Sequence, residues 1–127
     1  MSEDLYSEAA LEHLARPRNI GTLDDPSGTG SDANPSCGDR TTITLRIDGR
    51  QVAEVRFRTF GCTAAIASAS VLTELAGGRS VEDAARLEPA DILNALGGLP
   101  ARKEACALMA VGALRAALVD ARVRTTA

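Results

Sequence analysis

Three cysteines and one aspartate are the residues of this chain best suited to chemistry. Cys37 and Asp39 are separated by a single glycine, whereas Cys62 and Cys106 each stand alone further along. Three thiolates and a carboxylate can complete a tetrahedral metal shell, and such a sulfur-rich set selects zinc or an iron–sulfur cluster over magnesium or calcium. Because the spacing lacks paired CxxC motifs, the fold itself must bring these ligands together. The single carboxylate is the more exchangeable ligand, which favours transient occupancy.

Two other interpretations of the cysteines remain open from the residues alone. A cysteine nucleophile needs a histidine base, and the only histidine, His13, lies on a semi-apolar helix face that is typical of a packing residue. The cysteines could also be small buried apolar side chains. Against that, a helix is predicted directly after Cys62, and Arg102 and Lys103 precede Cys106. Both features predict a lowered thiol pKa.

Two alternating segments predict a β-hairpin. Residues 41–47 and 51–59 place apolar side chains at every second position, as strands with one buried face do. Asp48 and Gly49 between them form a pair that two-residue hairpin turns prefer. The side chains predicted to face the core are Ile43, Leu45, Ile47, Ala53, Val55 and Phe57.

The hairpin gives three of the four candidate ligands a reason to converge. Cys37 and Asp39 precede the first strand and Cys62 follows the second, so antiparallel pairing places them at the same end of the sheet. Gly38 permits a tight turn with positive φ between the first two. Cys106 reaches them only through the last helix, which makes it the mobile and reactive member of the set.

Helices account for much of the remaining chain. They are predicted over residues 4–15 and 63–76, after a capping box at Ser80, from Pro89 to Gly97, and from Pro100 to about Val123. The apolar stripe predicted for the last helix is Leu108, Val111, Leu114 and Leu118. Residues 20–36 are predicted to be loop with one short strand. The fold class is therefore α+β, a small antiparallel sheet (the hairpin plus a short third strand) packed against four to five helices.

Composition narrows the function classes. The chain of 127 residues is expected to form a single domain over residues 1–127, with an aliphatic core because only three aromatic residues are present. A net charge of −3 with interspersed signs argues against nucleic-acid binding. No apolar run long enough for a membrane span and no signal-peptide pattern is found, and unpaired cysteines suit a reducing compartment. The expected location is the cytoplasm.

The motifs around these residues resemble the IscU/NifU N-terminal family of iron–sulfur cluster assembly scaffolds, including its SufU-like members. The resemblance covers nearly the whole chain. The matching segments are Tyr6-Ser7-Glu8, His13, Pro17-Arg18-Asn19, Asn34-Pro35-Ser36-Cys37-Gly38-Asp39, residues 60–70, Leu99-Pro100-Ala101-Arg102-Lys103 and Cys106.

The resemblance implies a scaffold, which is a binding protein and not an enzyme in the strict sense. A cysteine desulfurase would deliver sulfur as a persulfide, iron would enter the same site, and a transient [2Fe–2S] cluster would pass to acceptor apo-proteins. Cys37, Asp39, Cys62 and Cys106 would be the ligands of cluster, iron or zinc. Cys106 would be the main persulfide acceptor and Asp39 would keep the site labile. A monomer or weak dimer is implied.

Two departures from the family pattern sharpen this expectation. Ala105 stands where the IscU branch has a histidine directly before its third cysteine, so the shell must come from the three cysteines and Asp39. The SufU branch also lacks that histidine, and it implies an alternative function, a zinc-dependent persulfide acceptor or sulfurtransferase that does not itself hold the cluster. That branch, however, carries an insertion before the third cysteine that this chain lacks. Residues 99–103 also differ from the Leu-Pro-Pro-Val-Lys segment gripped by a dedicated Hsp70 chaperone, which weakens the case for that partner.

Overall fold

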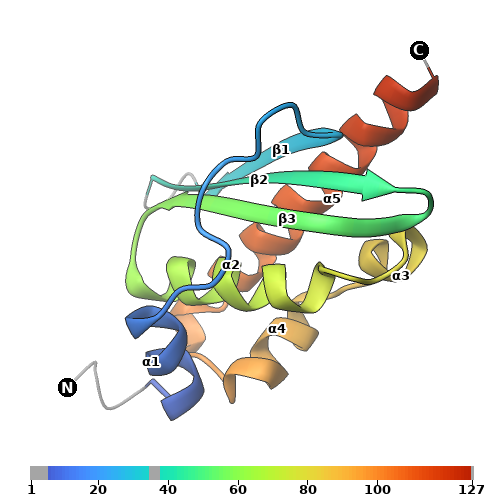
Figure 1. Cartoon of the computed structure of the whole chain (residues 1–127). Helices are drawn as coiled ribbons and strands as arrows, with labels where there is room; N and C mark the ends of the chain where they lie inside the picture. Colours follow the sequence, from blue (N-terminus) through green and yellow to red (C-terminus); the bar gives the residue numbers. More distant parts are fainter. Residues whose placement is uncertain (1–5, 35–37, 127) are drawn as a thin grey trace.

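In the part of the chain that the structure describes, a three-stranded antiparallel sheet and five α-helices make up the fold (Figure 1). The computed structural model describes residues 6–34 and 38–126. The elements are α1 (Glu8–Ala15), β1 (Gly28–Asn34), β2 (Asp39–Asp48), β3 (Gln51–Phe60), α2 (Thr63–Ala76), α3 (Val81–Ala85), α4 (Pro89–Leu96) and α5 (Ala105–Thr126). The strand order is β1-β2-β3. The predicted α+β class is thus confirmed. Within the part described, no helix is long and apolar enough to cross a membrane.

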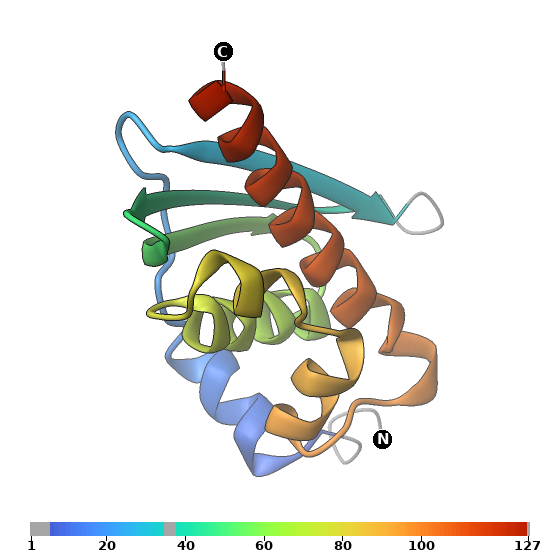
Figure 2. The same ribbon diagram turned by 90° about the vertical axis from the view of Figure 1, so that its right-hand side faces the viewer.

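The helices cover one face of the sheet. α5 crosses β1 and β2, while α2 packs under β3 and joins α1 and α4 on its other side (Figure 2). The core between them is aliphatic, as the composition predicts, with Phe57 as its buried ring. Its largest fully buried side chains are Phe57, Ile43, Leu45, Leu72, Ile92, Leu96, Leu114, Val52 and Val111.

β1 and α5 approach one another more closely than side chains would permit. A Cβ atom on Gly30 would lie 2.2 Å from the backbone nitrogen of Ala117 and 2.5 Å from the carbonyl oxygen of Ala113. Gly28 is equally constrained, because a Cβ atom added to it would lie 2.2 Å from the carbonyl oxygen of Ala117. The two glycines and the alanines opposite them therefore set the spacing between the sheet and the helix that carries Cys106.

The hairpin follows the prediction except at one bulge. Arg46 pairs with Glu54, but the next residue, Ile47, pairs with Val52, so one residue of β3 has no partner in the register. That residue is Ala53, which is exposed, while Val52 is fully buried in its place. The prediction that Ala53 faces the core is wrong, because a bulge shifts strict alternation by one position.

The turn of the hairpin lies one residue later than predicted. Asp48 pairs with Gln51, which leaves Gly49 and Arg50 as the two turn residues. Gly49 has a φ of +66°, a conformation in which glycine avoids the steric cost of a Cβ atom.

The helices begin and end where the capping and glycine signals predict, but the buried face of the last helix differs from the prediction. α2 has the predicted bounds, Ser80 caps α3 through its side chain, and Gly97 ends α4 in the left-handed conformation. A 3₁₀ turn (Ala101–Lys103) precedes α5, which begins at Ala105. Leu108 is 59% exposed, so its assignment to the buried stripe is wrong. The alanine-rich sequence leaves the buried face of α5 poorly marked, and packing on the sheet selects it.

His13 joins α1 to α2 through buried hydrogen bonds. Its Nδ1 lies 2.7 Å from Ser70 Oγ, and its Nε2 lies 3.3 Å from a Glu74 carboxylate oxygen. Because Ser70 Oγ accepts the Arg18 backbone N–H at 2.9 Å, its hydroxyl proton is free to point at Nδ1, and Nε2–H then donates to Glu74. The prediction that His13 is a hydrogen-bonded packing residue is confirmed.

This arrangement predicts a pH-dependent stability. Burial lowers the pKa of His13 below its ordinary value, more than the Glu74 carboxylate raises it. The unfolded chain then binds the proton more readily, so His13 stabilises the fold fully above about pH 6.5 and less as the pH falls. Between pH 7 and 5.5 the free energy of unfolding should fall by at most about 1.4 kcal/mol per pH unit from this group. Urea denaturation of wild type and His13→Gln measures it; equal pH slopes in both would contradict the assignment.

Candidate metal centre

Three of the four predicted ligands converge at one end of the sheet. One carboxylate oxygen of Asp39 and the sulfur atoms of Cys62 and Cys106 all lie within 4.8 Å of one another. No other such group of His, Cys, Asp and Glu side chains occurs among residues 6–34 and 38–126. Cys37, the fourth predicted ligand, lies outside the described residues.

Each of these three candidate ligands is placed by the boundary of a different element. Asp39 is the first residue of β2, directly after Gly38, whose φ of +78° forms the predicted tight turn. Cys62 is the N-cap of α2, with no side-chain capping bond that would occupy its sulfur. Cys106 is the second residue of α5. The hairpin brings the first two together as the sequence predicts, and α5 supplies the third.

The spacing of the two sulfurs suits a tetrahedral metal. Cys62 Sγ and Cys106 Sγ are 3.8 Å apart, and both thiols are free. A disulfide would require about 2.05 Å. Two thiolates bound to one tetrahedral zinc at about 2.3 Å are separated by about 3.8 Å. The sulfurs therefore stand at the distance that a shared metal would impose.

The carboxylate of Asp39 is buried without a full set of partners. The side chain is 6% exposed, and its Oδ2 has no hydrogen-bond partner among the described residues. A buried carboxylate oxygen in this state is costly unless a cation balances it. Because one oxygen of this carboxylate lies within 4.8 Å of both sulfurs, a cation between the three side chains could balance it.

Gly61 makes room for this carboxylate, a role that the sequence interpretation missed. A Cβ atom on Gly61 would lie 2.5 Å from Asp39 Cγ and 2.8 Å from Oδ1. The backbone between β3 and α2 therefore packs directly on the ligand. In the sequence, the only indication of this role is a glycine between the end of a strand and the N-cap of a helix. The contact of Gly61 with Asp39 becomes visible only in the folded structure.

Cys106 is less activated than predicted. The side chain is 3% exposed, and burial, together with the neighbouring Cys62 and Asp39, raises its pKa to about 12. Lys103 acts in the opposite direction but does not prevail. The expectation that Arg102 and Lys103 give a low-pKa thiol is wrong, because the desolvation of a thiolate at Cys106 outweighs the charge of Lys103.

Lys103 acts chiefly on Cys62. The negative charge of a Cys62 thiolate is the main cause that raises the pKa of Lys103, and a hydrogen bond between the two side chains adds to it. The 3₁₀ turn before α5 thus directs this cation across the site, toward the N-cap cysteine. Because Lys103 is close to Cys106 along the chain, the sequence predicts Cys106 as its partner instead.

A cysteine–histidine nucleophile is not formed by these residues. Both ring nitrogens of His13 are engaged, by Ser70 and Glu74 on α2. His13 is the only histidine of the chain, so neither Cys62 nor Cys106 has an imidazole base.

Sequence comparison identifies the family. Residues 5–127 match the NifU-like N terminal domain. The iron-sulfur cluster assembly scaffold protein IscU 1 of Archaeoglobus fulgidus is 41% identical over 116 residues, covering 91% of this chain and 76% of that protein. The iron-sulfur cluster assembly scaffold protein IscU of Aquifex aeolicus is 40% identical over 117 residues, covering 91% and 74%.

Solved structures show the same fold. A NifU-like protein (N-terminal) from Brucella abortus aligns with a TM-score of 0.75 at 20% identity, covering 96% of this chain and 97% of that one. A putative scaffold protein for the SUF system from Fervidobacterium islandicum aligns with a TM-score of 0.74 at 23% identity, covering 93% and 99%. With the family match spanning almost every residue, the chain belongs to the family of NifU-like N-terminal domains, and its relatives from Archaeoglobus fulgidus and Aquifex aeolicus are iron–sulfur cluster assembly scaffold proteins.

Proposed function

We propose that this chain is an iron–sulfur cluster assembly scaffold that works as a single cytoplasmic domain. The observation that carries the proposal is the convergence of Asp39, Cys62 and Cys106 from three separate elements, with Asp39 Oδ2 lacking any described partner. The two unbonded thiols 3.8 Å apart suit a compartment that keeps cysteines reduced. The cluster is cargo, built and then released.

The proposed shell contains Cys37, Asp39, Cys62 and Cys106. Ala105 is exposed at the start of α5 and offers no ligand atom, so nothing there replaces the carboxylate. Iron would enter through Asp39 and the thiols, and a [2Fe–2S] cluster would form on the same residues. One oxygen ligand among sulfurs favours release over permanent binding.

Sulfur would arrive as a persulfide from a cysteine desulfurase. Cys106 sulfur would attack the outer sulfur of the donor, forming a new S–S bond while the donor leaves as a thiolate, so this step involves no net oxidation. Reduction of that sulfur to sulfide takes two electrons from a thiol or a redox protein. Burial raises the pKa of Cys106, and a cation held by Asp39 and Cys62 would lower it again and favour the thiolate. The exposed ring of Phe60, 80% accessible beside Gly61, supports docking of the donor at this end.

A zinc-dependent sulfurtransferase of the SufU type is the second candidate. The 3.8 Å sulfur separation, equal to the edge of a zinc–thiolate tetrahedron, favours it. Against it, only a short segment with one 3₁₀ turn joins the end of α4 to the start of α5, with no insertion.

Anaerobic reconstitution separates the two candidates. Metal-free protein is mixed with ferrous iron, cysteine, a cysteine desulfurase and dithiothreitol as reductant. The scaffold function predicts visible iron–sulfur absorption with equal amounts of iron and sulfide on the protein, and loss of both in Cys62→Ser. Protein that stays colourless, yet accelerates the desulfurase only when loaded with zinc, would establish the sulfurtransferase instead.

Replacing Asp39 with alanine should stabilise the metal-free protein and also prolong the lifetime of a bound cluster. The metal-free protein should gain about 1–3 kcal/mol of stability, because a buried carboxylate oxygen that has no partner among the described residues is removed. A reconstituted cluster should persist longer, because the exchangeable ligand is lost. Urea denaturation and the decay of absorption in the presence of a chelator measure the two effects.

Asp24→Ala is the matched control for the Asp39 variant, since it removes an exposed carboxylate remote from the site. Its stability and cluster lifetime should equal those of wild type. Cluster loss in Asp39→Ala that is as fast as in Asp24→Ala, or faster, would refute the role of the carboxylate in release.

A further inference from the structure

An apolar groove lies at the end of the sheet opposite the metal centre. It has a volume of about 660 Å³ and opens to solvent between the hairpin turn, α3 and the C-terminal half of α5. Its apolar lining comes from Ile47, Val81, Ala85, Leu118, Val119 and Ala121. Val119 is 60% exposed there and adjoins the other apolar residues of the lining, so the groove presents a continuous apolar patch to solvent.

One wall of the groove is a face of α5 whose residues are spaced along the sequence as in the contact surfaces between packed helices. Arg115, Leu118, Val119 and Arg122 of α5 follow the i, i+3, i+4, i+7 pattern, which spans two turns. Helices pack by placing such rows into the grooves of a neighbour. The same spacing is used when an amphipathic helix of a partner binds in a groove.

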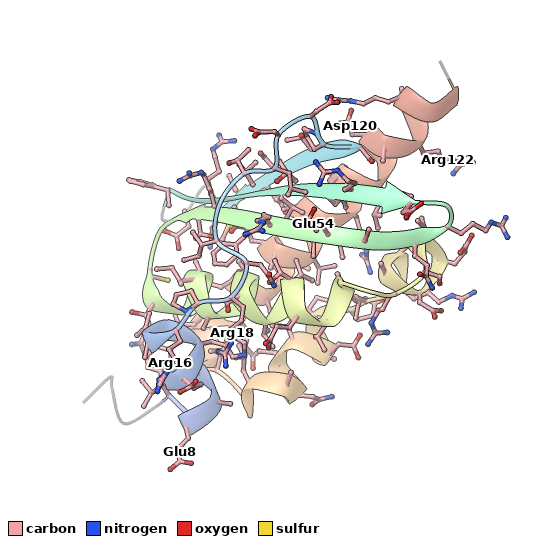
Figure 3. All side chains as sticks on the ribbon, in the orientation of Figure 1. Glu8, Arg16, Arg18, Glu54, Asp120 and Arg122 are labelled. Atoms are coloured by element: carbon pink, nitrogen blue, oxygen red, sulfur yellow. The ribbon has the colours of Figure 1, made fainter. Side chains whose placement is uncertain are left out.

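The rim of the groove is positively charged although the chain is acidic overall. Among the residues that line it, the charged ones are Arg50, Arg115, Arg122 and Glu82, in a chain whose net charge is −3. Arg115 is held in place by Glu88 at 3.2 Å and by the carbonyl oxygen of Leu87 at 2.9 Å. Arg122 projects from the C-terminal part of α5 (Figure 3). Such a rim attracts carboxylates at the edge of an apolar contact.

From these observations we infer that the groove docks an acidic amphipathic helix of a partner protein. Its apolar face covers Val119, beside the buried Leu118, and its carboxylates meet the arginines. A second copy of this chain is disfavoured as occupant, because a symmetric contact would bring two sets of arginines together. A small anionic amphiphile is disfavoured because the groove is open along the helix and would leave such a ligand largely exposed.

The position of the groove lets this partner bind while the metal centre is in use. β2 and β3 each span 10 residues, and the turn with Arg50 is at the end away from Asp39 and Cys62. At about 3.3 Å per residue, the two sites are separated by roughly 30 Å. Docking at the groove therefore leaves the metal end free for a sulfur donor or an acceptor.

A designed peptide tests the inference on the full chain. The probe is a fluorescein-labelled helical peptide of about 14 residues with leucines on one face and glutamates flanking them. Fluorescence anisotropy should show saturable binding to wild type. Val119→Glu should weaken binding at least about tenfold, and Arg50→Glu about three- to tenfold, with the second loss shrinking at high salt.

Matched controls make the result specific. Arg16→Glu removes the same charge from the exposed end of α1, remote from α5 (Figure 3), and should bind the probe as wild type does. A probe with lysines in place of glutamates should not bind. Zinc-loaded and metal-free protein should bind the acidic probe with affinities within about twofold of each other.

Three results would overturn the inference. The first is equal binding of the probe by wild type and Val119→Glu. The second is dodecanoate binding that Val119→Glu abolishes while the peptide fails to bind, which would make the occupant a small amphiphile. The third is a wild-type dimer in sedimentation that Val119→Glu converts to monomer, which would make the groove a self-interface.

Discussion

Cys106→Ser is expected to weaken zinc binding by about 10²- to 10³-fold. A structural zinc site of four ligands is worth about 10–16 kcal/mol, so one thiolate contributes about 3–4 kcal/mol, which corresponds to this loss. Serine has nearly the volume of cysteine, so the buried position on α5 stays filled. Competition with a chromophoric zinc chelator under anaerobic conditions measures the affinity.

The comparison variants for Cys106→Ser are Cys62→Ser and Leu108→Ser. The first removes the sulfur 3.8 Å away and should cause a loss of similar size. The second changes an exposed residue of the same helix, two positions on, and should bind zinc as wild type does. A Cys106→Ser protein that keeps its zinc affinity within about threefold of wild type would exclude Cys106 as a ligand.

Gly30→Ala is expected to lower the free energy of unfolding by about 3 kcal/mol or more. The added methyl would lie 2.2 Å from the nitrogen of Ala117, and backbone atoms cannot rotate away as a side chain could. Either β1 separates from α5 or the helix shifts along the sheet. Since α5 also carries Cys106, zinc affinity should fall in the same variant.

Ala33→Val is the control for Gly30→Ala, because it enlarges an exposed residue of the same strand. Its stability should stay within about 0.5 kcal/mol of wild type. The two are compared by the midpoint of urea denaturation. If Gly30→Ala unfolds at the wild-type midpoint, then the close packing of β1 on α5 does not determine stability.

Local patterns were sufficient to predict much of the fold. Alternation predicted both strands of the hairpin, and glycine, proline and serine signals predicted the limits of α2 and α4. The bulge that buries Val52 instead of Ala53 was not predictable, because it depends on how β3 pairs with β2 and not on its own sequence. The exposed position of Leu108 has a related cause, since alanines on several faces of α5 leave the choice of face to tertiary packing.

The convergence of the candidate ligands was predictable where the strand topology alone determines it. An antiparallel hairpin brings Asp39 and Cys62 to one end whatever the rest of the chain does, and the structure confirms their approach to Cys106. The charge environment was not predictable. Sequence neighbours suggested that Lys103 activates Cys106, but burial dominates that thiol and the lysine interacts mainly with Cys62. Solvation depends on what covers a side chain, which no local motif encodes.

The buried carboxylate of Asp39, whose Oδ2 has no partner among the described residues, has a consequence for the lifetime of the protein. Anything that binds the native form and balances this carboxylate stabilises it by mass action, whereas the empty form retains the cost of a buried charge. Chains that open more often are the ones that proteases remove. The supply of metal would therefore set how long each molecule survives between rounds of loading, and a shortage would reduce the amount of scaffold along with its output.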